Sequence, residues 1–116
     1  SSHEMQEALD EAGIGDLVRA MPRGMQSELL TGGLPLTGRQ RVRLLVARAL
    51  VLRPRLLLVD QFLDGLDDDT LASMLRVLTH PSRPWTLVVA TRDAQLAARV
   101  GCVIELGART EGASHA

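Results

Sequence analysis

The chain has 116 residues, a length that suits one small domain, and 46% of them are hydrophobic while 23% are charged. Its net charge of -1 excludes a global field that would attract nucleic acid or an anionic membrane surface. Phe62 and Trp85 are the only aromatic residues. We therefore expect a core of Leu, Val, Ala and Met, and not a nucleic-acid site that stacks bases on aromatic rings.

Several residue types are scarce, and their scarcity limits the chemistry. All 13 basic residues are Arg, so the chain contains no phosphate-binding loop of the GxxxxGK[ST] type, which needs a Lys. Cys102 is the single cysteine and is expected in the core, whereas the three histidines, which share no spacing, are expected at the surface (His3, His80 and His115). No run reaches the ~18 apolar residues that span a bilayer, and no signal peptide is visible, so we expect a soluble, intracellular segment.

The first third of the chain predicts short helices and a loop. Apolar residues between Met5 and Ala20 partly follow a helical period, and Gly13 and Gly15 interrupt it, which favours two short helices over one. Pro22 and Gly24 mark a turn. Residues 25–35, which include a Gly-Gly pair and a proline, are expected to form an ordered loop.

A strong helix is predicted to begin at Thr37, a good N-cap residue, and to end before Pro54. Its core-facing stripe follows the helical spacing and contains Val42, Leu45, Val46, Ala49 and Leu50. Four arginines lie mainly off this stripe: Arg39, Arg41, Arg43 and Arg48. They either form a solvated face or pair with acids elsewhere in the domain.

The remaining segments alternate between strands and helices. Leu56–Val59 and Thr86–Ala90 are apolar runs typical of buried parallel strands, and Cys102–Leu106 is predicted as a third strand. Helices are expected at about Thr70–Leu78 and Ala94–Val100. This alternation predicts an α/β fold, with a helical part followed by a mainly parallel sheet layer with flanking helices.

Two places in the chain are candidates for binding chemistry. Thr37, Gly38, Arg39 and Gln40 begin a helix, where free N–H groups and the helix dipole favour an anion, although the pattern also fits an ordinary helix start. Asp60 follows an apolar strand, where a carboxylate either orients Mg²⁺ or serves as a turn residue. The acids from Asp67 to Asp69 fit the positive end of the next helix without any further function.

The spacing between these places resembles the nucleotide-binding (ATPase) domains of exporter-type ABC transporters. Residues 36–43 read LTGRQRVR, similar to the family signature LSGGQ followed by RQR, and residues 47–50 read ARAL. An Arg-Pro turn, a strand and the Walker-B-like Asp60-Gln61 follow without a gap, and residues 64–67 align with the D-loop pattern SALD. Met21 to Gly33 and the ending from Glu111 to His115 also follow the family frame.

The resemblance implies a partial P-loop NTPase-like domain, with residues 1–53 as its helical signature part and 54–116 as its Walker-B, D-loop and switch part. Asp60 would act on Mg²⁺, Asp67 would be the D-loop aspartate, and Thr37 to Gln40 would contact the nucleotide of a partner domain. The Walker-A half of such a domain has no counterpart in this sequence. We therefore expect ATP and Mg²⁺ in a full-length parent and neither in the isolated chain.

Three residues depart from the family pattern. Gln61 replaces the Glu that follows the Walker-B Asp, and an amide does not accept a proton from water. Arg92 replaces the switch His, and Arg39 replaces the second signature Gly, where its side chain either blocks a phosphate or contacts it. The changes at Gln61 and Arg92 imply impaired hydrolysis in the parent; the alternative is harmless drift in a working ATPase.

The function implied by the resemblance is the coupling of ATP binding to transmembrane transport, at the cytoplasmic face of the cell membrane. The partners would be a second nucleotide-binding domain and a transmembrane domain, without nucleic acid. The alternative is a catalytically inactive docking module that keeps the fold; an Arg-helix nucleic-acid binder is disfavoured by the net charge. In either case the isolated chain should expose strand edges and apolar surface, and therefore self-associate or be partly disordered.

Overall fold

Two short helices open the chain, as the interrupting glycines predict. The computed structural model describes residues 1–27 and 36–107, and it places α1 at Ser2–Glu11 and α2 at Gly15–Ala20. Gly13 lies between them at φ +78°, a left-handed conformation that ends a helix at little cost when the residue is glycine. A turn and a short 3-10 helix, η1 (Gly24–Gln26), follow. The rest of the expected loop, at 28–35, and the ending with His115 lie outside the described residues.

The predicted long helix is α3 (Gly38–Leu52), and its two ends form where the sequence places them. Thr37 Oγ1 accepts a hydrogen bond from the Gln40 N–H at 3.2 Å, and Gln40 Oε1 accepts one from the Thr37 N–H at 2.9 Å, which completes a capping box. Arg53 adopts the left-handed conformation at φ +50°, just before Pro54. The helix therefore begins and ends through local chemistry.

The buried face of α3 is shifted from the predicted stripe. Val42, Val46 and Ala49 are buried as expected, but Leu45 is 43% exposed and Ala47 is buried instead. The helix contacts α1 as well as the later helix α4 (Asp68–Leu78), so it buries residues toward two neighbours and not along a single stripe. The helical spacing that predicts burial of Leu45 assumes a helix with one buried face, and this assumption does not hold for α3.

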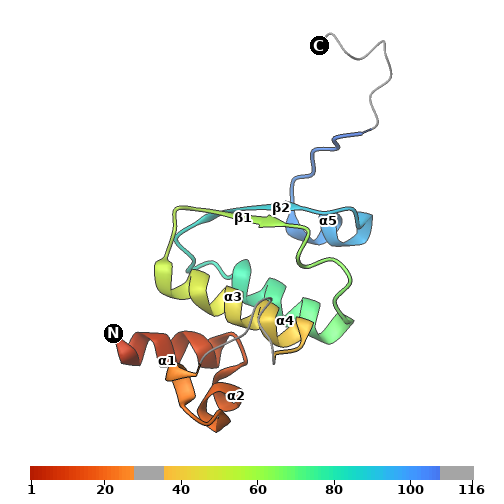
Figure 1. Cartoon of the computed structure of the whole chain (residues 1–116). Coiled ribbons are helices and arrows are strands. Elements are labelled where there is room, and N and C mark those ends of the chain that lie inside the picture. The colour runs from red at the N-terminus through yellow and green to blue at the C-terminus, as the bar shows by residue number, and fades with distance from the viewer. Residues whose placement is uncertain (28–35, 108–116) are drawn as a thin grey trace.

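The sheet consists of two parallel strands, β1 (Leu56–Asp60) and β2 (Thr86–Ala90). Leu56 pairs with Thr86 and Asp60 pairs with Ala90, so both strands end at the same edge. The crossover between them contains α4, and α5 (Ala94–Val100) follows β2. Figure 1 shows the sheet on one side of α3 and α4, with α1 and α2 on the other side.

The core lies between these layers and is aliphatic, apart from Trp85. Its largest fully buried side chains are those of Leu63, Met74, Leu78, Leu96, Val46 and Val59. Trp85 is also buried, and its indole N–H donates to the Leu78 carbonyl at 3.0 Å, which satisfies its one polar group. Leu63 reaches this core from the loop between β1 and α4, so the core anchors that loop.

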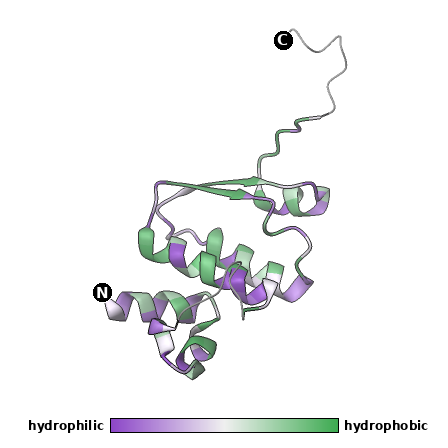
Figure 2. Cartoon of the chain, viewed as in Figure 1, coloured by the Kyte–Doolittle hydropathy of each residue, from purple (hydrophilic) through white to green (hydrophobic). Residues whose placement is uncertain are grey.

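The strands are not fully buried, contrary to the sequence prediction. Leu57 and Val59 face the helices, but Leu56 is 54%, Leu58 64% and Val88 47% exposed on the opposite face. Figure 2 shows both strands as hydrophobic. A continuous apolar run is typical of a strand covered on two faces, and the described residues cover one. The predicted exposure of apolar surface is thus confirmed.

The third predicted strand, Cys102–Leu106, is wrong for this structure. These residues form no strand, and Figure 1 shows them leading away from the sheet. Val103 and Ile104 are 54% and 82% exposed, and Cys102, expected in the core, is exposed as well. A strand exists only with a neighbouring edge to hydrogen bond to, and within the described part of the chain this segment has none.

The helices α1 to α3 all precede Arg53, and both strands follow Arg55. This order makes the fold a small mixed α/β arrangement, as expected. The functional division of the chain at residue 53 stays a prediction. Over residues 1–27 and 36–107, every helix is too short or too polar to cross a membrane.

Candidate functional site

The first candidate site is the beginning of α3. In the capping box, Thr37 Oγ1 accepts the hydrogen bond of the Gln40 N–H. The N–H groups of Gly38 and Arg39, in the same first turn, have no partner inside the helix. The space beside Gly38 is open, because a Cβ built there would meet no heavy atom within 4 Å. The first turn of α3 is therefore accessible from outside the chain.

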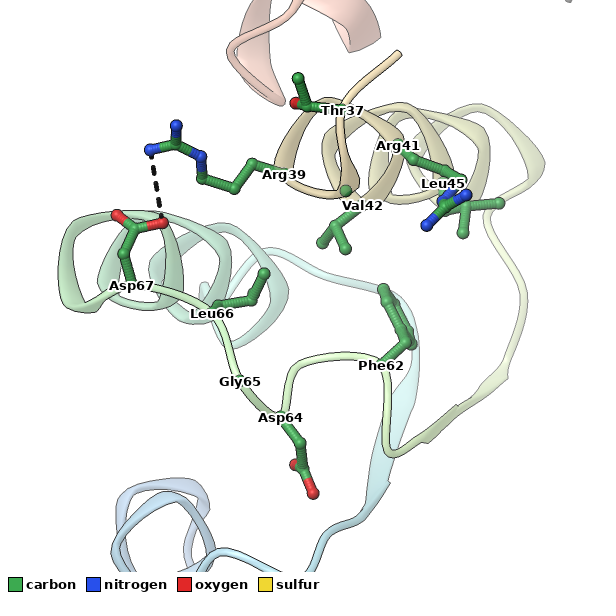
Figure 3. Close-up of a pocket in the computed structure, with 11 residues that line it drawn as sticks. Thr37, Arg39, Arg41, Val42, Leu45, Phe62, Asp64, Gly65, Leu66 and Asp67 are labelled. Carbon is green, nitrogen blue, oxygen red and sulfur yellow. Dashed lines mark ion pairs between the residues drawn. The ribbon is translucent and has the colours of Figure 1, made fainter. Parts of the chain in front are cut away.

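A cavity of about 620 Å³ lies between this turn and the loop at residues 61–67, which joins β1 to α4. Figure 3 shows Thr37 and Arg39 on the helix side and Phe62 and Asp67 on the loop side. Val42, Leu45, Phe62 and Leu66 supply its apolar surface. The cavity thus joins two regions that are about thirty residues apart in the sequence.

Arg39 and Asp67 face each other across the mouth of this cavity. Their closest side-chain nitrogen and oxygen are 3.7 Å apart, and the side chains are 65% and 41% exposed (Figure 3). Hydrogen bonds from Thr70 lower the pKa of Asp67 below its ordinary value, and the Arg39 charge adds to that shift as its smallest cause. Water screens so exposed a pair, and the contact is weak.

The arginines of α3 turn out to be mixed in role. Arg39 pairs with an acid, as one of the two sequence interpretations expects. Arg43 is half-buried and donates to the Ala12 carbonyl at 3.1 Å and to Ser73 Oγ at 3.4 Å. Arg48 is exposed and belongs to the solvated face. The helix surface is therefore partly structural and partly solvent-facing.

The second candidate site is the edge of the sheet where β1 and β2 end. Asp60 is exposed there, and the following Gln61 adopts φ +61°, a left-handed conformation that is unfavourable for a residue with a side chain. The Gln61 N–H donates to the Ala90 carbonyl at 2.7 Å, which ties this residue to β2. The backbone of Gln61 is thus constrained by the tertiary structure.

The residues of this edge do not by themselves form a cation site. Over the described ranges 1–27 and 36–107, no three His, Cys, Asp or Glu side chains gather as metal ligands. Mg²⁺ in proteins is held by one or two carboxylates together with substrate phosphates and water. Asp60 supplies one such carboxylate, so the remaining ligands of any Mg²⁺ here would come from other molecules or from residues outside this set.

Arg92 lies in the loop between β2 and α5, and an aspartate that sequence reasoning did not single out holds that loop. Asp64 Oδ1 accepts a hydrogen bond from Thr91 Oγ1 at 2.5 Å, and Asp64 Oδ2 accepts one from the Arg92 N–H at 3.0 Å. The partners are 27 and 28 residues apart, so no local pattern reveals them. The only hint was the position of Asp64 within the D-loop-like stretch.

The predicted site residues therefore fall into two groups. Arg39 and Asp67 meet at the cavity, whereas Gln61 and Arg92 are connected through Ala90 and Asp64 at the sheet edge. Within the described residues, no hydrogen bond or ion pair joins one group to the other. The loop at residues 61–67 belongs to both.

No protein-family model matches the chain. Among curated proteins, the chain is 34% identical to the ATP-dependent lipid A-core flippase of Psychrobacter arcticus. This alignment of 116 residues covers 93% of this chain and 20% of the flippase. It is 32% identical to ATP-binding cassette sub-family B member 6 of Rattus norvegicus, over 90% of this chain and 13% of that protein. The ABC multidrug transporter atrC of Emericella nidulans is also 32% identical, over 99% of this chain and 9% of that transporter.

The chain is similar in fold and in sequence to the solved structure of a bacterial Atm1-family ABC exporter with ATP bound. The TM-score is 0.65 and the identity 33%, over 78% of this chain and 16% of that one. The chain thus spans a fifth or less of the length of these relatives. The structure defines this chain as an α/β segment that has two parallel strands and candidate site residues at the edge where both strands end. The chain belongs to the ABC transporter family and corresponds to a segment of its exporters.

Proposed function

We propose that this chain is the portion of an exporter's ATP-binding domain that carries the signature, Walker-B, D-loop and switch positions of a P-loop NTPase-like fold. The parent protein couples ATP binding to transport across a membrane. One observation carries this proposal: the accessible first turn of α3 and the Asp67 loop face each other across one cavity. In the family pattern the first turn of this helix contacts a nucleotide held by a partner domain, and Asp67 is the D-loop aspartate.

The partners in this proposal are a second nucleotide-binding domain and the transmembrane domain of the transporter, with the assembly at the cytoplasmic face of the cell membrane. Residues 1–53 form the signature part and 54–116 the part with Asp60. The apolar outer face of the sheet, with Leu58 64% exposed, supports a further covering layer in the parent. The net charge of -1 argues against a nucleic-acid partner.

Hydrolysis in the parent is proposed to be impaired. The amide of Gln61 cannot take a proton from an attacking water, unlike a carboxylate at the same position. Arg92 provides a permanent charge where the family has an imidazole. ATP binding would persist, because arginine pairs well with phosphate and Asp60 retains the carboxylate for Mg²⁺.

The test is the ATPase rate of the parent protein with Gln61→Glu and Arg92→His combined. We expect a rise of at least about tenfold, because a positioned general base contributes on the order of 10²–10⁴ in rate. The matched control makes the same two exchanges at exposed positions of α5, Gln95→Glu and Arg99→His, and should leave the rate unchanged. An equal rate in the reverted and original proteins would refute the impairment.

The isolated chain is proposed not to bind Mg-ATP with micromolar affinity, since its predicted Mg²⁺ position offers a single carboxylate, that of Asp60, and the sequence contains no lysine to bind a phosphate. Titration calorimetry on the chain measures this directly, and micromolar binding would contradict the proposal.

A second candidate function is an inactive docking module. The replacement of the second signature Gly by Arg39 favours it, because a large side chain then stands at the accessible first turn of α3. A Walker-A motif and a membrane domain in the parent gene would support the transporter, and their absence the docking module.

A further inference from the structure

The loop after β1 and the loop after β2 are joined side by side at the edge of the sheet. The Gln61 N–H donates to the Ala90 carbonyl, and the Asp64 N–H donates to the Gln61 carbonyl at 3.2 Å. The carboxylate of Asp64 then accepts from both Thr91 and Arg92. One short segment thus connects two of the three positions at which this chain departs from the family pattern, Gln61 and Arg92.

Asp64 is suited to this connection by its charge and its reach. A carboxylate has two oxygens that both accept, and here one takes a side-chain hydroxyl while the other takes a backbone N–H. A serine, which the family pattern has at this position, offers one oxygen on a shorter side chain. Hydrogen bonds to a charged acceptor are also stronger than those between neutral groups.

The contacts continue beyond Asp64 toward α5. Thr91 Oγ1, which donates to Asp64, also accepts the Asp93 N–H at 3.0 Å, and Asp93 Oδ1 caps α5 by accepting the Gln95 N–H at 2.9 Å. The backbone around Arg92 is therefore held on both sides. The side chain of Arg92 is itself exposed, and no described side chain forms an ion pair with it.

We propose that Asp64 is a positioning residue, which holds the backbone of Arg92 against the loop of Gln61 and so directs the Arg92 guanidinium toward a nucleotide phosphate at the sheet edge. The nucleotide phosphate in this inference rests on the proposed function. The positioning of the Arg92 backbone by Asp64 is independent of that function. In this proposal Asp64 acts through Arg92.

The first experiment measures the positioning in the 116-residue chain by amide hydrogen exchange. Asp64→Ala removes both acceptors, and we expect the Arg92 N–H to exchange at least about tenfold faster. Asp64→Asn keeps one oxygen and should give a smaller increase. Asp68→Asn, an exposed change in the first turn of α4, is the charge-matched control and should leave the Arg92 rate as it was. An unchanged rate in Asp64→Ala would overturn the proposal.

The second experiment uses the parent protein and a double-mutant cycle with Mg-ATP binding as its readout. Asp64→Asn should weaken binding severalfold when Arg92 is present and have no effect in the Arg92→Ala background. An equal loss in both backgrounds would assign Asp64 a merely structural role and refute the proposal. A parent that binds no nucleotide would overturn both the proposed function and the direction of Arg92 toward phosphate, while the exchange experiment still decides whether Asp64 holds the loop.

Discussion

The start of α3 offers the sharpest stability test, because Thr37 and Gln40 form its capping box and also lie in the turn that resembles the family signature. In Thr37→Ala the hydroxyl that accepts the Gln40 N–H is lost, while the bond from the Thr37 N–H to Gln40 Oε1 can still form. Loss of one N-cap bond costs about 1 kcal/mol, within a range of about 0.5–2 kcal/mol. Thr37→Ser keeps the hydroxyl and should be almost neutral.

Urea unfolding followed by circular dichroism measures this difference. A chain of this size has a denaturant slope of about 1–3 kcal/mol/M, so a loss of about 1 kcal/mol lowers the midpoint by roughly 0.3–1 M. Gln40→Ala removes the reciprocal bond, and the double variant should lose less than the sum of the two, because the bonds belong to one box. Equal midpoints for Thr37→Ala and Thr37→Ser would refute the reasoning.

Three further outcomes are expected. Met74→Ala empties a fully buried site and should reduce the free energy of unfolding by about 2–5 kcal/mol in the same urea assay; a loss below about 1 kcal/mol would contradict the core assignment. If the outer face of the sheet drives self-association, Leu58→Glu should lower the apparent mass in light scattering, whereas Leu52→Glu, equally exposed at the end of α3, should not. The carboxyl of Asp67 should titrate below 3.8 by NMR, so its contribution to stability is complete above that pH and is lost as the pH falls through the lowered value; a midpoint at or above 3.8 would contradict the contacts at the start of α4.

Much of the fold was predictable because its signals are local. The cap of α3, the end of that helix before Pro54 and the break at Gly13 between α1 and α2 each depend on a few neighbouring residues, and each lies where it was expected. The family resemblance was likewise visible in the spacing from the signature-like turn to Asp60, and the comparisons with known transporters confirmed it.

The predictions that were wrong concern contacts with something not adjacent in sequence. The run Cys102–Leu106 has the composition of a strand, but strand formation needs a partner edge, which composition cannot report. The burial of both strand faces was inferred from the hydrophobicity of the strands. Hydrophobicity indicates the environment that suits a sequence, but it does not show whether the described residues supply that environment. Leu45 was misplaced because α3 has two neighbours.

The sequence by itself determined which residues cap, break and periodically face the core, and it determined the family through the spacing of its motifs. Only the tertiary structure decided that Arg39 meets Asp67 across a cavity and that Asp64 holds the loop of Arg92. The physical reason is that capping and helical period depend on bonds to near neighbours along the chain. The contacts of Arg39 and Asp64 depend on how a crossover brings the ends of two parallel strands and the start of a helix together in space.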